Sequence, residues 1–187
     1  MLIFIVGSPA SGKTSIVSRC KDYGGLQSIK VGDIMLKDAR RSGYSGDRDG
    51  LRKMQLQEML ELQRRALRKL SRLRGDYLID THLSVEADGR FVSGLPESSL
   101  GDLKKASCII YVDAPTEEIM SRRVLDRSRV REKESRLMIE TQRGVNLSAL
   151  SYISWHLGIP FYLIENRNGM LDASVKKVKA IIDEFVG

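Results

Sequence analysis

Short apolar runs alternate along the chain with longer segments in which apolar residues recur every three or four positions. The short runs have the length and the Ile, Val and Leu content of buried strands, and they are residues 2–6, 27–31, 76–81, 107–114 and 160–166. The longer segments have the helical period, and they are residues 12–22, 33–42, 48–74, 98–105, 116–127, 133–157 and 171–186. This alternation predicts an α/β fold, with a five-stranded parallel sheet and helices on both of its faces.

The segment 48–74 carries an apolar stripe that repeats nearly every seven residues and is surrounded by arginines. The stripe consists of Leu56, Met59, Leu60, Gln63, Ala66, Leu67, Leu70 and Leu73, and the arginines are Arg64, Arg65, Arg68 and Arg72. Such a stripe favours a helix face buried in the core, and a subunit interface is the alternative. Residues 84–96 interrupt the alternation of strands and helices, and Asp88-Gly89 within them predicts a small hairpin.

Length and composition favour one ordinary globular domain over residues 1–187. The composition is 42% hydrophobic and 29% charged, and no segment has the roughly 20 apolar residues of a membrane-spanning helix. The first apolar run has no basic residues before it and no cleavage pattern after it, so it is interpreted as a strand rather than a leader. Cys20 and Cys108 lie far apart and fit neither a disulfide framework nor a zinc site, which favours a reducing cytoplasm.

The net charge of +7 favours anionic ligands, which include nucleotides and nucleic acids. Aromatic residues make up only 6% of the chain and do not alternate with basic ones, so no stacking platform for bases is expected. Nucleic acid as the main partner is therefore disfavoured.

The stretch GSPASGKT, residues 7–14, has the pattern of a phosphate-binding loop between a strand and a helix. Its glycines let successive backbone N–H groups point at phosphate oxygens, and Lys13 adds a positive charge for the terminal phosphates. Thr14 offers a hydroxyl to Mg²⁺. The predicted ATP-binding residues are Gly7, Ser8, Pro9, Ala10, Ser11, Gly12, Lys13, Thr14 and Ser15.

A carboxylate that orients Mg²⁺ waters should stand at the end of a neighbouring strand. Asp80 ends the apolar run 76–81 and is predicted to have this role beside Thr14. Asp113 also ends an apolar run, but Pro115 and Thr116 after it are typical of a helix start, so helix capping is the expected role of Asp113.

Two groups of arginines indicate what is done with the bound phosphates. Phosphoryl transfer needs cations around the migrating group, and one group crowds a short stretch, namely Arg122, Arg123, Arg127, Arg129 and Arg131. This stretch is either a lid that closes over the phosphates or a solvated charged face.

The second group follows the second strand, where Gly32 and Asp33 stand at the edge at which open sheets bind ligands. Arg48 and Arg52 lie four residues apart and could hold an acceptor phosphate on one helix face. An ion pair of Arg48 with Asp47 or Asp49 is the alternative.

Taken together and in order, these fragments resemble the archaeal-type adenylate kinases, a short-lid branch of the nucleoside monophosphate kinases with the P-loop NTPase fold. The resemblance covers nearly the whole chain, and it rests on GSPASGKT, GDIML, GYSGDRDGLRK, YLIDTH, the GLP of residues 94–96, Ser121-Arg122 with Asp126, Arg129 and Arg131, and Ile139-Glu140-Thr141.

The resemblance implies that ATP and AMP give two ADP with Mg²⁺, that an AMP-binding insert spans about residues 32–75, and that a short lid spans about 122–135. It implies an AMP site formed by Gly32, Asp33, Arg48, Arg52, His82, Gly94, Leu95 and Pro96. It also implies catalytic roles for Lys13, Arg122, Arg129, Arg131 and Arg143, and assembly into trimers. The family carries an arginine where this chain has Asn146, and Arg143 lies one helical turn earlier, so either residue is a candidate to approach the transferred phosphoryl group.

Two other functions fit parts of the pattern. A kinase of a small hydroxyl acceptor needs a base near the hydroxyl, and Asp33 could serve, although the paired Arg48 and Arg52 favour a phosphate acceptor. A nucleotide-dependent switch or RNA-associated ATPase would instead use the basic helix 48–74 as its docking surface.

Overall fold

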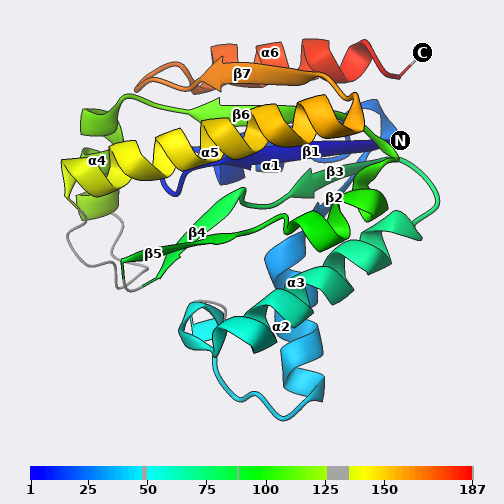
Figure 1. Ribbon diagram of the computed structural model, residues 1–187. Coiled ribbons are helices and arrows are strands. Elements are labelled where there is room, and N and C mark those ends of the chain that lie inside the picture. The colour runs from blue at the N-terminus through cyan, green and yellow to red at the C-terminus, as the bar shows by residue number, and fades with distance from the viewer. Residues whose placement is uncertain (48–49, 88, 126–134, 187) are drawn as a thin grey trace.

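A five-stranded parallel sheet forms the centre of the molecule in a computed structural model that describes residues 1–47, 50–87, 89–125 and 135–186 (Figure 1). The strands lie in the order β2-β3-β1-β6-β7 and all pair in parallel. Their bounds are β1 Leu2–Gly7, β2 Gln27–Lys30, β3 Tyr77–Asp80, β6 Ala106–Asp113 and β7 Phe161–Glu165. The five strands predicted from the apolar runs are confirmed.

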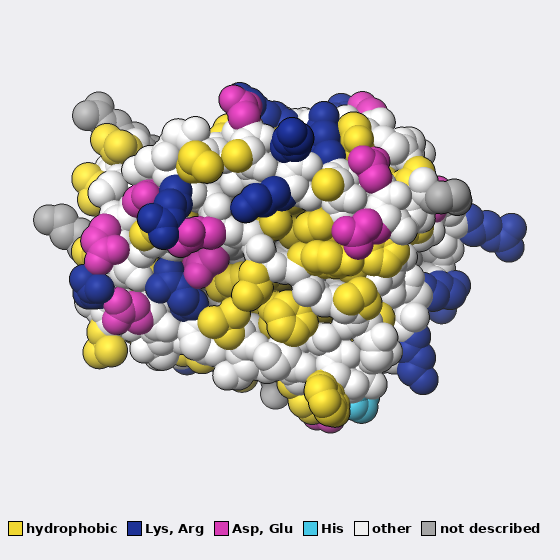
Figure 2. All heavy atoms as spheres, turned by 90° about the horizontal axis from the view of Figure 1, so that it is seen from above, with side chains coloured by type: hydrophobic (Ala, Val, Ile, Leu, Met, Phe, Trp, Pro, Cys, Tyr) yellow, Lys and Arg dark blue, Asp and Glu magenta, His cyan; other side chains and the backbone are white. Residues whose placement is uncertain are grey.

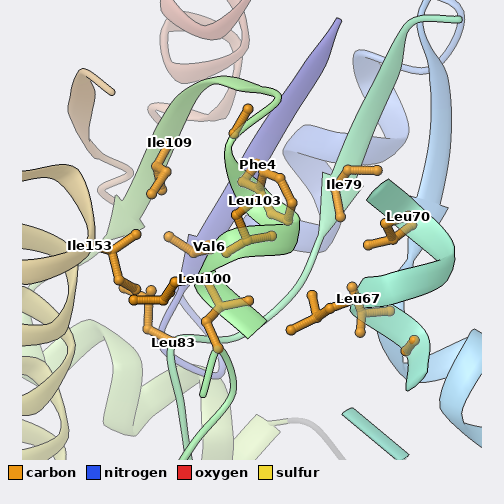
Figure 3. Close-up of a cluster of buried hydrophobic side chains, with 14 of the residues drawn as sticks. Phe4, Val6, Leu67, Leu70, Ile79, Leu83, Leu100, Leu103, Ile109 and Ile153 are labelled. Atoms are coloured by element: carbon orange, nitrogen blue, oxygen red, sulfur yellow. The ribbon is translucent and has the colours of Figure 1, made fainter. Parts of the chain in front are cut away.

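Helices cover both faces of this sheet because side chains of the buried strands point alternately to either side. On β1, Phe4 and Val6 join a cluster with α3 and α5, whereas Ile3 and Ile5 join a cluster with α1 and α6. Figure 3 shows the first of these clusters, in which Ile153 of α5 lies with Val6. The helices are α1 Lys13–Arg19, α2 Val31–Arg41, α3 Leu56–Ser71, α4 Thr116–Leu125, α5 Arg136–Leu157 and α6 Leu171–Asp183.

The segment predicted as one helix over residues 48–74 is divided, and this expectation is wrong in its first part. A 3₁₀ turn, η2, covers Gly50–Lys53, and α3 begins at Leu56. The turn is fixed by the Gly50 N–H, which donates to Asp47 Oδ1 at 2.8 Å, and by Tyr44, since a side-chain carbon at Gly50 would lie 2.2 Å from the Tyr44 hydroxyl oxygen. Local helical periodicity cannot reveal that packing.

The apolar stripe of this segment belongs to the core rather than to a subunit interface. Met59, Ala66, Leu67 and Leu70 of α3 are each at most 4% exposed. They pack in the same cluster as the sheet residues Phe4 and Ile79. The predicted helix 98–105 is a 3₁₀ helix, η3 Glu97–Leu103, which packs against α3.

The hairpin predicted within residues 84–96 is confirmed and forms a separate two-stranded antiparallel sheet. Its strands are β4 Ser84–Ala87 and β5 Arg90–Ser93. The chain returns from β5 to the main sheet through Gly94, whose N–H donates to the Leu83 carbonyl oxygen at 2.7 Å.

The long helix α5 has its own start and stop signals. The Ser135 hydroxyl oxygen accepts a hydrogen bond from the Met138 N–H at 3.2 Å, and Gly158 ends the helix at a φ of 68°. Neither α5 nor any other helix of the described residues is both long and apolar enough to cross a membrane.

The outer strand β7 leaves apolar side chains uncovered on one face. Ile164 packs with α6, so Phe161 and Leu163 point to the other face of the strand, where they are 38% and 60% exposed. Viewed from above, hydrophobic side chains gather across the middle of this side of the molecule (Figure 2). The edge strand and this surface face away from α2 and α3 (Figure 1).

Candidate active site

In the loop between β1 and α1, the backbone at Gly7 and at Gly12 lies close to atoms of other segments. A side-chain carbon at Gly7 would lie 2.2 Å from the Val112 carbonyl oxygen, and one at Gly12 would lie 2.1 Å from Asn166 Nδ2. Ala10 and Gly12 have positive φ values of 67° and 88°. The loop therefore has the sharply bent backbone that the sequence pattern predicts.

Lys13 and Asp80 form a buried ion pair beside this loop. The pairing of β1 with β3 places Ile5 opposite Asp80, so the carboxylate stands where the loop leaves the sheet. Lys13 Nζ contacts Asp80 Oδ1, and the two side chains are only 6% and 4% exposed. A buried lysine and a buried carboxylate each need such a partner, so a competing anion at the loop would disturb both.

The donors at this point fit a magnesium ion that is shared with phosphates. Thr14 is exposed in the first turn of α1 and carries a hydroxyl, and Asp80 supplies a carboxylate. Mg²⁺ takes one or two protein oxygens together with substrate phosphates and water. Within the described part of the chain no group of three or more His, Cys, Asp and Glu could hold a metal ion.

Arg122 of α4 reaches the loop through a fixed set of hydrogen bonds. It donates from Nη1 to the Ala10 carbonyl oxygen at 3.4 Å and from Nη2 to the Asn166 carbonyl oxygen at 2.8 Å. Glu118 accepts from Arg122 Nη2 at 2.8 Å and from the Asn168 N–H at 2.6 Å. The guanidinium is thus oriented between the glycine loop and the segment after β7.

Arg123 is a second cation at the loop. It is 9% exposed and donates from Nη2 to the Pro9 carbonyl oxygen at 3.3 Å. Within the stretch that the sequence suggests as a lid, Arg122 and Arg123 therefore lie against the loop. Arg127, Arg129 and Arg131 lie outside the described residues.

Asn146 of α5 connects the loop to the hairpin. Its Nδ2 donates to Ser8 Oγ at 3.3 Å, and its Oδ1 accepts from Ser84 Oγ at 2.7 Å. Asn146 is 1% exposed, so both contacts are shielded from water. Burial, followed by the charge of Asp113, raises the pKa of the Tyr111 hydroxyl, which lies 3.5 Å from Ser8 Oγ and stays protonated at neutral pH.

Arg143 lies one turn before Asn146 and makes different contacts. It donates to Asp113 Oδ2 at 2.6 Å, to Thr116 Oγ1 at 2.9 Å and to the Ala114 carbonyl oxygen at 2.6 Å. Asp113, which the sequence suggests as a helix cap, thus accepts a charged hydrogen bond from Arg143. Of the two candidates on α5, it is Asn146 that contacts the glycine loop.

The residues expected to bind the acceptor follow two adjacent strands. Lys30 of β2 pairs with Asp80 of β3, so Gly32 and Asp33 in the first turn of α2 and His82 after β3 leave the sheet at the same edge. Gly94 lies against this point, since a side-chain carbon there would be 2.0 Å from the His82 carbonyl oxygen.

Of the remaining expected acceptor residues, Leu95 is buried and Pro96 precedes η3. Arg48 lies outside the described residues. Arg52 belongs to η2, and its side chain is outside the described part of the structure.

Sequence reasoning missed Asn166. Asn166 Nδ2 donates to the Ser11 carbonyl oxygen at 2.9 Å, and its backbone N–H donates to Asp113 at 2.8 Å. A polar residue at the end of the fifth apolar run was a signal of the same kind as Asp80. Asn146 and Arg123 were named from the sequence, but their contacts with the glycine loop depend on the packing of α5 and α4.

The fold and the site together define a P-loop protein of the α/β class. The glycine loop lies between the first strand and the first helix, and a buried lysine and carboxylate lie at the carboxyl edge of the parallel sheet. Residues 6–140 match the family described as AAA domain, AAA_17, and the chain belongs to that family.

Relatives over nearly the whole chain are adenylate kinases of archaea. The chain is 26% identical over 184 residues to that of Methanothermobacter thermautotrophicus, a match covering 97% of this chain and 99% of the relative. It is 29% identical over 182 residues to that of Methanopyrus kandleri, with 94% of each chain covered. The resemblance to archaeal-type adenylate kinases is confirmed.

Solved structures with the same fold include shikimate kinases. That of Bacteroides thetaiotaomicron superposes with a TM-score of 0.63 at 11% identity, covering 98% of both chains. That of Aquifex aeolicus gives a TM-score of 0.60 at 18% identity, covering 98% of this chain and 97% of the other. At these identities the likeness concerns the fold, and it confirms the P-loop α/β architecture.

Proposed function

We propose that this protein is an adenylate kinase, which transfers the γ-phosphoryl group of ATP to AMP and forms two ADP. One observation carries the proposal: Lys13 and Arg122 reach the same glycine loop, at the sheet edge where the predicted acceptor residues also emerge. Phosphoryl transfer depends on such placement of cations, because there is little covalent chemistry for the protein to perform. The full-length archaeal relatives support the choice of AMP as acceptor.

In this proposal the glycine loop binds the donor nucleotide. Its backbone N–H groups hold the phosphates, and Lys13 moves from Asp80 to the terminal phosphates when their charge arrives. Thr14 and Asp80 would hold Mg²⁺, which when bound neutralises charge on the phosphate oxygens. Arg122, already oriented by Glu118, adds a further positive charge at the loop.

The transfer itself needs no general base. An oxygen of the AMP phosphate is already anionic; it forms a bond to the γ-phosphorus of ATP while the bond from that phosphorus to the β–γ bridging oxygen breaks. The bridging oxygen leaves as part of one ADP, and AMP becomes the other. Arg129 and Arg131 of the proposed lid, about 122–135, would close over the transferred group together with Arg122.

The acceptor is assigned to an insert at about residues 32–75 and to the turn after the hairpin. Gly32, Asp33 and His82 follow β2 and β3. Gly94 lies against the His82 carbonyl oxygen, and Leu95 and Pro96 come directly after Gly94. Arg48 and Arg52 would hold the AMP phosphate in bidentate fashion. Asn146, which connects Ser8 of the loop to Ser84 of the hairpin, would keep the donor and acceptor sides in register.

An acceptor panel tests this assignment. The protein is incubated with labelled ATP, Mg²⁺ and, one at a time, AMP, GMP, CMP, UMP and shikimate, and the products are separated. Phosphorylation of AMP well above the others is expected. Robust phosphorylation of shikimate or CMP with a dead reaction toward AMP would contradict the acceptor, and ATP hydrolysis stimulated by RNA without transfer would contradict the reaction class.

The proposal includes self-association, because the family resemblance implies trimers. The uncovered face of β7, with Phe161 and Leu163, supports it, since edge strands with exposed apolar side chains are prone to pair with another chain.

A further inference from the structure

A groove between α2 and α3 collects basic side chains away from the glycine loop. This basic groove has a volume of about 310 Å³, and its charged lining residues are Arg41, Arg65, Arg68, Lys69, Arg72 and Asp38. Arg65, Arg68 and Arg72 lie three and four residues apart and so share one face of the α3 segment. The span from Arg65 to Arg72 is about 10 Å along the helix axis.

The groove is electrostatically unbalanced. Asp38 is its one carboxylate, and both of its oxygens accept from Lys69 Nζ, at 2.5 and 2.7 Å. Within the described residues no carboxylate lies at ion-pair distance from Arg41, Arg65, Arg68 or Arg72.

Several arginines elsewhere on the surface are paired. Arg64 contacts Glu61 one turn away on α3, Arg136 contacts Glu117 and Glu140, and Arg167 contacts Glu165. These three arginines have acidic neighbours, whereas no carboxylate among the described residues pairs with Arg41, Arg65, Arg68 or Arg72.

The basic groove lies at the other end of the sheet from the candidate active site. Nucleotide sites of open parallel sheets form at the carboxyl ends of the strands. The last turn of α3 instead leads into the amino end of β3 at Tyr77. The same turn of α3 contacts the end of η3 and the residue before β6. Ser71 Oγ donates to Asp102 Oδ1 at 3.2 Å, and Lys105 Nζ donates to the Ser71 carbonyl oxygen at 3.2 Å. The α3 side of the groove therefore lies away from the glycine loop.

The lining indicates which anion fits. Among the described residues no large hydrophobic side chain of α2 or α3 is exposed, so neither helix can insert into a membrane surface. The groove lining contains no aromatic residue on which an unpaired base could stack. A row of unpaired arginines on an open surface suits closely spaced phosphates that face outward, as they do on a duplex. We propose that the basic groove binds the phosphate backbone of duplex nucleic acid without reading its sequence.

Salt-dependent binding of a labelled DNA duplex tests this proposal. Each phosphate contact contributes about −0.9 to the slope of log Kobs against log salt, so contacts by all five groove cations would give about −4.5. Replacing three arginines (Arg65→Gln, Arg68→Gln, Arg72→Gln) should weaken binding and make this slope shallower by about 2.7. The circular dichroism spectrum and the thermal unfolding midpoint of the same variant should match those of the unmodified protein, which shows that the variant is folded.

The matched control removes three arginines that have carboxylate partners (Arg19→Gln, Arg64→Gln, Arg136→Gln) and so changes the net charge equally. It should bind the duplex with the slope of the unmodified protein. The proposal is overturned if the two triple variants lose the same slope, if the unmodified protein binds single strands or anionic vesicles but no duplex, or if Lys13→Ala rather than the groove variant removes binding.

Discussion

Gly12 and Asn166 show how a single position shapes the glycine loop. Gly12 combines a φ of 88° with a backbone so close to Asn166 Nδ2 that a side-chain carbon would lie 2.1 Å away. Gly12→Ala should cost the left-handed backbone penalty of about 1–2 kcal/mol and, in addition, displace Asn166 and weaken ATP binding. The measurements are denaturant unfolding and ATP titration.

Gly25→Ala is the matched control, because Gly25 has a φ of 76° and no heavy atom within 4 Å of the added carbon. It should lower the free energy of unfolding by the backbone penalty alone and leave ATP affinity unchanged. Equal effects of the two substitutions on stability and on ATP affinity would show that the contact with Asn166 has no consequence.

Asn146 is expected to connect Ser8 and Ser84 in the protein interior rather than to take over the role of the arginine that the family carries at this position. Asn146→Ala leaves the buried hydroxyls of Ser8 and Ser84 without this amide, at a cost of about 1–3 kcal/mol in the free energy of unfolding. In a double-mutant cycle with Ser84→Ala, the combined loss should be smaller than the sum of the two single losses. Strict additivity would mean that the two side chains are not coupled.

At the scale of elements, α4 and the segment after α2 should affect different kinetic parameters. Arg122→Ala removes a cation at the loop and should lower kcat by about 10² to 10³, by analogy with the loss of one oxyanion donor. Arg52→Ala should chiefly raise the KM for AMP, because this segment is assigned to holding the acceptor in the ground state and the transition state alike.

Steady-state kinetics with AMP varied at saturating ATP separates these effects. Arg136→Ala serves as the control, since Arg136 pairs with Glu117 and Glu140 on the surface and should leave both parameters near their original values. An unchanged kcat for Arg122→Ala together with an unchanged KM for Arg52→Ala would show that both arginines are solvated surface residues without a role in the reaction.

At the scale of the whole molecule, the face of β7 should control self-association. Leu163→Glu places a charge among apolar side chains and should convert an oligomer to monomers without unfolding the chain, because Leu163 is already 60% exposed. Val186→Glu, at a side chain that is 43% exposed near the end of the chain, should leave the assembly intact. Light scattering measures the molar mass of the unmodified protein and of both variants. A monomeric unmodified protein, or a Leu163→Glu protein of unchanged molar mass, would contradict this interface.

Local pattern was sufficient for the parts of the fold that repeat locally. The inner strands β1 and β6 are buried on both faces, so they were visible as apolar runs, and the outer strands β2 and β7 were visible as shorter runs with apolar residues on at least one face. The glycine loop was visible because its bent backbone requires Gly7 and Gly12 at fixed spacing. Asp80 was visible because a charged residue at the end of an apolar run stands out from that run.

Tertiary packing decided the rest. The break before α3 depends on Tyr44 packing across the turn at Gly50. The link from Ser8 to Ser84 depends on α5 crossing the sheet so that Asn146 reaches both. Such contacts join residues far apart in the chain, and no short window of sequence contains them.

The central claim is that the glycine loop transfers a phosphoryl group from ATP to AMP, and the ADP formed per ATP consumed tests it most directly. With AMP and Mg²⁺ present, the unmodified protein should give two ADP for each ATP, with one AMP lost. Lys13→Ala, which removes the cation of the loop, should abolish this conversion. One ADP per ATP with no loss of AMP, or full activity of the Lys13→Ala protein, would contradict the account.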